Sequence, residues 1–98
     1  MNKMITKEKV IQAIESVNDP EIGLNVWFLG LVYDIAVEHN KVKIVMTFTT
    51  PFCPYGPSLV EEVKDKIKQA GAADVEVEVV MEPPWQPSEE VKLALGIF

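Results

Sequence analysis

The chain has 98 residues, of which 48% are hydrophobic, and its formal net charge is −6. This size predicts a single domain, residues 1–98, while the negative charge disfavours nucleic acid and no apolar run is long enough to span a membrane. The N-terminus has no apolar signal segment and one cysteine cannot form an internal disulfide, so we expect a cytoplasmic protein.

The first predicted element is a helix that begins after Thr6, a residue suited to the N-cap position. Val10, Ile14 and Val17 recur at helical spacing and form its apolar stripe. Asn18-Asp19-Pro20 ends the helix. The loop that follows, residues 21–30, contains many large apolar side chains, so we expect it to pack against the body of the domain.

Residues 31–48 predict a β-hairpin with His39-Asn40 as its two-residue turn. Apolar residues then face one another on one side of the hairpin: Leu31 and Phe48, Tyr33 and Met46, Ile35 and Ile44, Val37 and Val42. A slip of one residue would destroy this agreement, so the pattern specifies the register.

A second helix is predicted from the capping box Ser58-Leu59-Val60-Glu61, with an alternative start one turn earlier at Pro54. Gly71 suits the position after its end. Residues 74–82 alternate as a strand that places Val75, Val77, Val79 and Met81 on one face. A short helix capped by Ser88 is expected near the C-terminus.

The element order α-β-β-α-β predicts an α/β fold of the α+β type. We expect two layers: a three-stranded mixed sheet with the helices on one face. The β-α-β connection makes the last two strands parallel, which brings three segments to one edge of the sheet: residues 19–30, 49–56 and 82–87. These segments contain the single cysteine and both tryptophans, so this edge is the candidate site.

The candidate site centres on Cys53, which lies where the strand pattern gives way to the helix pattern. A helix N-terminus favours the thiolate, the form that attacks electrophiles and binds soft metals. The alternative is that Cys53 is a small buried hydrophobe. His39 lies at the hairpin turn, more than roughly 20 Å from Cys53, so we do not expect a catalytic Cys–His pair.

Five further residues are candidates at this edge, and each has a structural alternative. Asp19 and Glu21 can ligate a metal or accept a proton from the thiol, or Asp19 can cap a turn while Glu21 is solvated. The hydroxyl groups of Thr49 and Thr50 can hydrogen-bond to a sulfur atom, or both can be ordinary strand residues. Trp85 can contact a ligand or serve as a lid over the edge of the core.

Motifs distributed over nearly the whole chain carry a family resemblance: Asp19-Pro20-Glu21, Leu29-Gly30-Leu31-Val32-Tyr33-Asp34, Met46-Thr47-Phe48-Thr49-Thr50-Pro51-Phe52-Cys53-Pro54 and Glu82-Pro83-Pro84-Trp85-Gln86-Pro87. In these motifs the chain resembles the small iron–sulfur cluster assembly domains that include SufT-type maturation factors and the phenylacetate-degradation protein PaaD. The resemblance implies a factor for assembly or transfer of iron–sulfur clusters, with scaffold or client proteins as partners. It maps the family's cysteine to Cys53 and its acidic motif to Asp19 and Glu21. The Met-Ser pair that many members carry after Trp-x-Pro is missing here, where Pro87 is followed by Ser88-Glu89-Glu90-Val91.

A single cysteine cannot supply the four ligands that a cluster normally takes from thiolates. We therefore hypothesise that Cys53 contributes one ligand to iron or to an iron–sulfur cluster that is bound transiently and shared across a homodimer or with a partner. In a weaker form of this hypothesis, the protein is an adaptor and Cys53 carries a persulfide or metal.

Two other classes stay open. One is a structural subunit of an oxygenase-type, PaaD-like complex, in which Cys53 is dispensable. The other is a thiol-dependent enzyme that uses Cys53 as nucleophile or redox centre and Glu21 as base. The sequence has no Ser-His-Asp set, phosphate-binding glycine loop or paired-cysteine zinc motif, so a non-enzymatic role is the favoured prediction.

Overall fold

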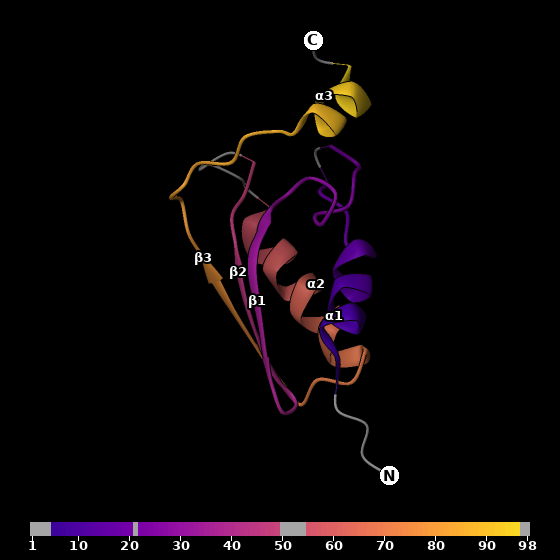
Figure 1. The fold of residues 1–98 in the computed structure, drawn as a ribbon, viewed down its shortest axis with the longest axis vertical. Coiled ribbons are helices and arrows are strands. Elements are labelled where there is room, and N and C mark those ends of the chain that lie inside the picture. The colour runs from indigo at the N-terminus through magenta and orange to yellow at the C-terminus, as the bar shows by residue number, and fades with distance from the viewer. Residues whose placement is uncertain (1–4, 21, 50–54, 97–98) are drawn as a thin grey trace.

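A computed structural model describes residues 5–20, 22–49 and 55–96. The elements, in chain order, are α1 (Lys7–Glu15), β1 (Val32–Glu38), β2 (Lys41–Met46), α2 (Gly56–Gln69), β3 (Asp74–Val79) and α3 (Glu89–Leu95). The three strands form one layer, α1 and α2 lie together on one face of it, and α3 lies beyond the end of the sheet (Figure 1). This confirms the predicted α+β architecture. Within the described ranges, no helix is long and apolar enough to cross a membrane.

The sheet has the strand order β1-β2-β3. β1 and β2 are antiparallel, and β2 and β3 are parallel, as the β-α-β connection through α2 predicts. β2 and β3 therefore terminate at one end of the sheet, where β1 starts. The hairpin turn at His39 lies at the opposite end.

The predicted register of the hairpin is correct near the turn and wrong at the far end. Ile35 pairs with Ile44 and Val37 with Val42, but Met46 pairs with Val32 and not with Tyr33. The register shifts between Val32 and Asp34, which leaves Tyr33 as the extra residue of a β-bulge.

The shift also moves the residue before the strand. The backbone N–H of Thr47 donates to the carbonyl oxygen of Leu31 over 2.8 Å, so Leu31 lies opposite Thr47 and not opposite Phe48 as predicted. The bulge places Val32 against the core, whereas the alternation alone had suggested the open face of the sheet.

Two of the three described helices have the N-cap residue that the sequence predicts. Thr6 caps α1 and Ser88 caps α3, each accepting a hydrogen bond from a backbone N–H three residues later. The capping box predicted at Ser58 is wrong, because α2 begins at Gly56 with Tyr55 as its N-cap and no side-chain cap. Pro57 lies in the first turn, where its fixed φ favours the helix and its missing N–H costs nothing, so the helix begins before Ser58. Pro54, the predicted alternative start, lies outside the described residues.

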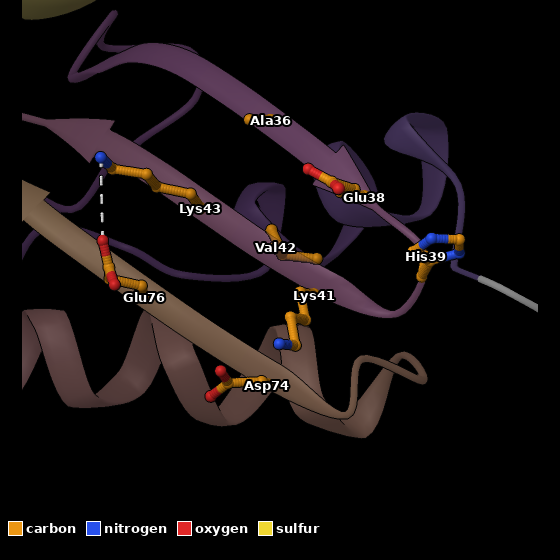
Figure 2. A pocket seen from close by; sticks show the side chains of 8 residues that line it. All are labelled: Ala36, Glu38, His39, Lys41, Val42, Lys43, Asp74 and Glu76. Atoms are coloured by element: carbon orange, nitrogen blue, oxygen red, sulfur yellow. Dashed lines mark ion pairs between the residues drawn. The ribbon is translucent and has the colours of Figure 1, made fainter.

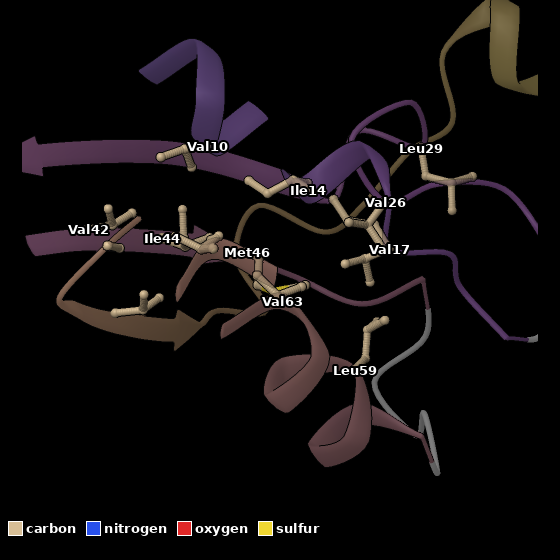
Figure 3. Close-up of a cluster of buried hydrophobic side chains, with 14 of the residues drawn as sticks. Val10, Ile14, Val17, Val26, Leu29, Val42, Ile44, Met46, Leu59 and Val63 are labelled. Atoms are coloured by element: carbon tan, nitrogen blue, oxygen red, sulfur yellow. The ribbon is translucent and has the colours of Figure 1, made fainter. Parts of the chain in front are cut away.

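The core lies between the helices and the sheet (Figure 3). It also includes the loop before β1, because Val26 and Leu29 are 0% and 1% exposed. This confirms that the apolar loop packs on the body of the protein. The alternation predicted for the third strand is correct, since Val75, Val77 and Val79 pair with the core residues Val42, Ile44 and Met46, but the strand ends at Val79 and not at residue 82. Val75 is buried, whereas Val79 is 37% and Met81 is 45% exposed. β3 is an edge strand, so its last residues have a neighbouring strand on one side alone.

Candidate functional site

The chain between β3 and α3, residues 80–88, crosses the end of the sheet, and we call it the strap (Figure 1). Besides the backbone bond from the N–H of Val80 to the carbonyl oxygen of Met46, two long-range side-chain hydrogen bonds among the described residues hold it in place. The Tyr33 hydroxyl group donates to the carbonyl oxygen of Pro83 over 2.7 Å, and Nε1 of Trp85 donates to the carbonyl oxygen of Leu29 over 2.6 Å. The strap is therefore bonded both to the bulge of β1 and to the apolar loop, as the predicted meeting of these segments requires.

A cavity of about 220 Å³ lies between the strap and the end of β2. Its walls are Thr47, Phe48, Thr49, Met81, Pro84 and Trp85. The cavity is smaller than the roughly 300–1,000 Å³ of typical small-molecule sites, so it suits a group of a few atoms. Two threonines on an otherwise apolar wall provide the polar contacts that such a group needs.

Trp85 has the lid role that the sequence offered, and its contact with a ligand stays a prediction. It packs against the core and is half-buried, so it covers the core edge as a lid. It also forms one wall of the cavity beside Thr49. Tyr33 was missed by the sequence analysis, which assigned it to the core face; its position in the bulge turns the hydroxyl group toward the strap.

Asp19 is 1% exposed and organises the turn between α1 and the apolar loop. Its Oδ1 accepts a hydrogen bond from the backbone N–H of Ile22 over 3.2 Å. Its own backbone donates to Leu24 O over 2.9 Å and accepts from the N–H of Gly23 over 2.7 Å. These bonds support the turn-capping interpretation, and a role of Asp19 toward a metal stays a prediction.

Replacing Asp19 with alanine should lower the free energy of unfolding by about 1–3 kcal/mol, since the partly buried N–H of Ile22 loses its acceptor. Asp19→Asn keeps an oxygen at Oδ1 and should lose clearly less. Urea unfolding followed by circular dichroism measures both. Equal losses for the two variants would show that the negative charge, and not the turn bond, is what matters at this position.

Cys53, Glu21 and Thr50 lie outside the described residues, but the chain on either side of Cys53 is described. Thr49 at one end lines the cavity, and Tyr55 at the other end is the N-cap of α2. Gly56, in the first turn of α2, lies against the side chain of Phe48, because a Cβ atom added to Gly56 would be 2.9 Å from Cε2 of Phe48. Phe48 also lines the cavity, so the cavity and the first turn of α2 are neighbours.

A second hollow, of about 430 Å³, lies at the hairpin end of the sheet and was not predicted (Figure 2). Acidic and basic side chains line it together with His39, which is exposed and has a φ of 56°. Oδ1 of Asn40, the other residue of the turn, accepts a hydrogen bond from the backbone N–H of Ile5 over 3.0 Å. In the part of the chain that the structure describes, no group of three or more His, Cys, Asp or Glu side chains could hold a metal ion.

Comparison with known proteins gives a consistent result. A family model described as "Iron-sulfur cluster assembly protein" matches residues 7–79. The Fe-S protein maturation auxiliary factor YitW of Bacillus subtilis is 41% identical over 93% of this chain and 94% of its own length. The Fe-S protein maturation auxiliary factor SufT of Staphylococcus aureus is 40% identical over 81% of this chain and 96% of its own. A conserved hypothetical protein from Thermotoga maritima has a solved structure with a TM-score of 0.86 and 42% identity, over 99% of this chain and 100% of that one.

Proposed function

Because the chain belongs to the iron–sulfur cluster assembly protein family, we propose that it is an accessory factor that assists the assembly of iron–sulfur clusters or their transfer to client proteins. Two relatives that it matches over most of their length are maturation auxiliary factors. We propose further that the 98 residues act as one domain in the cytoplasm, where a reducing environment keeps a lone thiol available.

The observation that carries the proposal is where the described residues on either side of Cys53 lie in the fold. Thr49 lines a cavity that has room for a few atoms, and Tyr55 is the N-cap of α2. A thiolate near a helix N-terminus is stabilised by unpaired N–H groups and the helix dipole, and soft metals bind thiolates. We propose that Cys53 ligates iron or a cluster as cargo, with Thr49 and Thr50 as hydrogen-bond donors to its sulfur.

The remaining candidates take supporting roles in this proposal. Trp85 excludes water from one wall of the cavity, and Asp19 and Glu21 are the carboxylates available to complete the coordination. One thiolate per chain does not hold a cluster, so we propose that the cargo is bound transiently between two copies of the chain or between this chain and a scaffold or client.

Anaerobic reconstitution with ferrous iron and sulfide tests the proposal. We expect the wild-type protein to gain visible absorption and bound iron, and Cys53→Ala to show at least about tenfold less of both, since Cys53 supplies the one thiolate of the chain. Cys53→Ser, which keeps an oxygen ligand of similar size, is the matched control and should retain little iron.

Two results would contradict the proposal. Equal iron in wild type and Cys53→Ala would place the cargo elsewhere. No chromophore in either protein, alone or mixed with a scaffold protein, would leave an adaptor role in which the domain holds another protein and Cys53 is not a ligand.

A further inference from the structure

The two edges of the sheet differ in how they are protected. Edge strands present unpaired backbone groups that invite another strand, and proteins protect them with bulges, lysine or proline. β1 has a bulge at Tyr33, and Lys7 and Trp27 lie beside it in a shared hollow. β3 pairs with β2 without interruption and contains no lysine or proline, so it is the open edge.

The hydrogen bonds at the two ends of β3 show which of its backbone groups face outward. The N–H groups of Asp74 and Val80 donate to carbonyl oxygens of Asn40 and Met46, on the β2 side. Neighbouring residues of a strand direct their N–H groups to opposite edges, so Val75, Val77 and Val79 direct theirs away from β2. Among the described residues, no strand pairs with this outer edge.

The pairing of β3 with β2 shows which side chains fit beside this strand. Each acidic residue of β3 pairs with Lys41, Lys43 or Val45 of β2, and each valine pairs with an apolar residue. Nζ of Lys43 lies 3.7 Å from the carboxylate of Glu76 and 3.3 Å from that of Glu78 (Figure 2 shows the first pair). Both glutamates are more than half exposed, so they are also accessible from the outer edge.

Charge argues against a second copy of this chain at that edge. Antiparallel pairing of two β3 strands about Val77 would place Glu76 of one copy opposite Glu78 of the other, and like charges directly opposite are destabilising. A partner strand with a basic residue at every second position would instead place positive charges opposite Glu76 and Glu78.

We propose that the outer edge of β3 is a docking site for an extended segment of a partner protein in which basic and apolar residues alternate. The segment adds a fourth strand to the sheet, with backbone hydrogen bonds to Val75, Val77 and Val79 and charge pairs to Glu76 and Glu78. The exposed side chains of Val79 at the end of β3 and of Met81 in the strap give its apolar side chains a surface to pack on. This inference rests on the proposed function in one respect, that an accessory factor must bind its scaffold or client.

The test uses a fluorescein-labelled hexapeptide with the sequence of Lys41–Met46 and the full-length protein, followed by fluorescence anisotropy. We expect wild type to bind it, and Val79→Pro to bind at least about tenfold more weakly, since proline removes an outward N–H and no bond to β2. Val79→Thr keeps the N–H and the β-branched shape and should bind within about threefold of wild type.

Charge variants give an independent test that does not depend on proline. Glu76→Gln with Glu78→Gln should weaken binding and reduce its dependence on salt. Asp34→Asn with Glu38→Gln makes the same change in charge on β1 and should leave binding unchanged. A peptide with glutamate in place of both lysines should not bind.

Three outcomes would overturn the inference. They are no binding of the peptide to wild type, equal binding to Val79→Pro, and self-association of wild type that Val79→Pro abolishes, which would make a second copy the occupant. If Val79→Pro does not fold, the test rests on two other measurements: binding to the variant with Glu76→Gln and Glu78→Gln, and binding of the peptide in which glutamate replaces both lysines. Unchanged binding in either measurement would then overturn the inference. The experiment contains no iron, so its failure leaves the proposed function standing, and failed reconstitution would not affect the peptide result.

Discussion

Replacing Trp85 with alanine is expected to lower the free energy of unfolding by about 3 kcal/mol. The half-buried indole packs against the core and donates one of the side-chain hydrogen bonds that hold the strap. Its removal leaves the carbonyl oxygen of Leu29 without this donor and opens the cavity to solvent on one side. Urea unfolding followed by circular dichroism measures the loss.

Trp85→Phe separates packing from hydrogen bonding, because it keeps an aromatic ring and removes Nε1. We expect it to cost about 1–2 kcal/mol, the usual effect of removing one hydrogen-bonding partner. Tyr33→Phe removes the hydrogen bond from the Tyr33 hydroxyl group to the carbonyl oxygen of Pro83 and provides the matched comparison. A loss below about 0.5 kcal/mol for Trp85→Ala, as for an exposed side chain, would show that the strap does not depend on this residue.

The sequence predicts most of the fold because its patterns agree with one another. The apolar face of the hairpin, the cap at Thr6 and the β-α-β connection each point to the same two-layer arrangement, which the structure confirms. Where the prediction is wrong, a second local signal or a distant contact overrides the local pattern. The alternating pattern assigns Tyr33 to the core, yet its hydroxyl group bonds to Pro83, 50 residues later in the chain.

The same reasoning applies to α2 and to the strap. The pattern Ser-x-x-Glu predicts a start at Ser58, but a proline one residue earlier also favours a first helical turn, and the two signals cannot both set the N-terminus.

The strap could be placed in part. Composition and topology predict that it lies at the end of the sheet, because the parallel strands end there. The hydrogen bond from Trp85 to the carbonyl oxygen of Leu29 cannot be predicted from a local pattern. Every residue has a backbone carbonyl group, so the sequence does not show which one accepts the bond.

The loop before β1 provides the last prediction, because it lacks regular secondary structure and yet belongs to the core. Leu29→Ala should lower the free energy of unfolding by about 2–5 kcal/mol, as for a leucine in a helix or strand core. Leu93→Ala is the matched control: this leucine is 62% exposed, and its loss should cost less than about 0.5 kcal/mol. Similar effects of the two substitutions would show that the loop is not part of the cooperative core. A large difference would mean that the loop, which accepts the Trp85 hydrogen bond, is a rigid support for the strap and for the cavity beneath it.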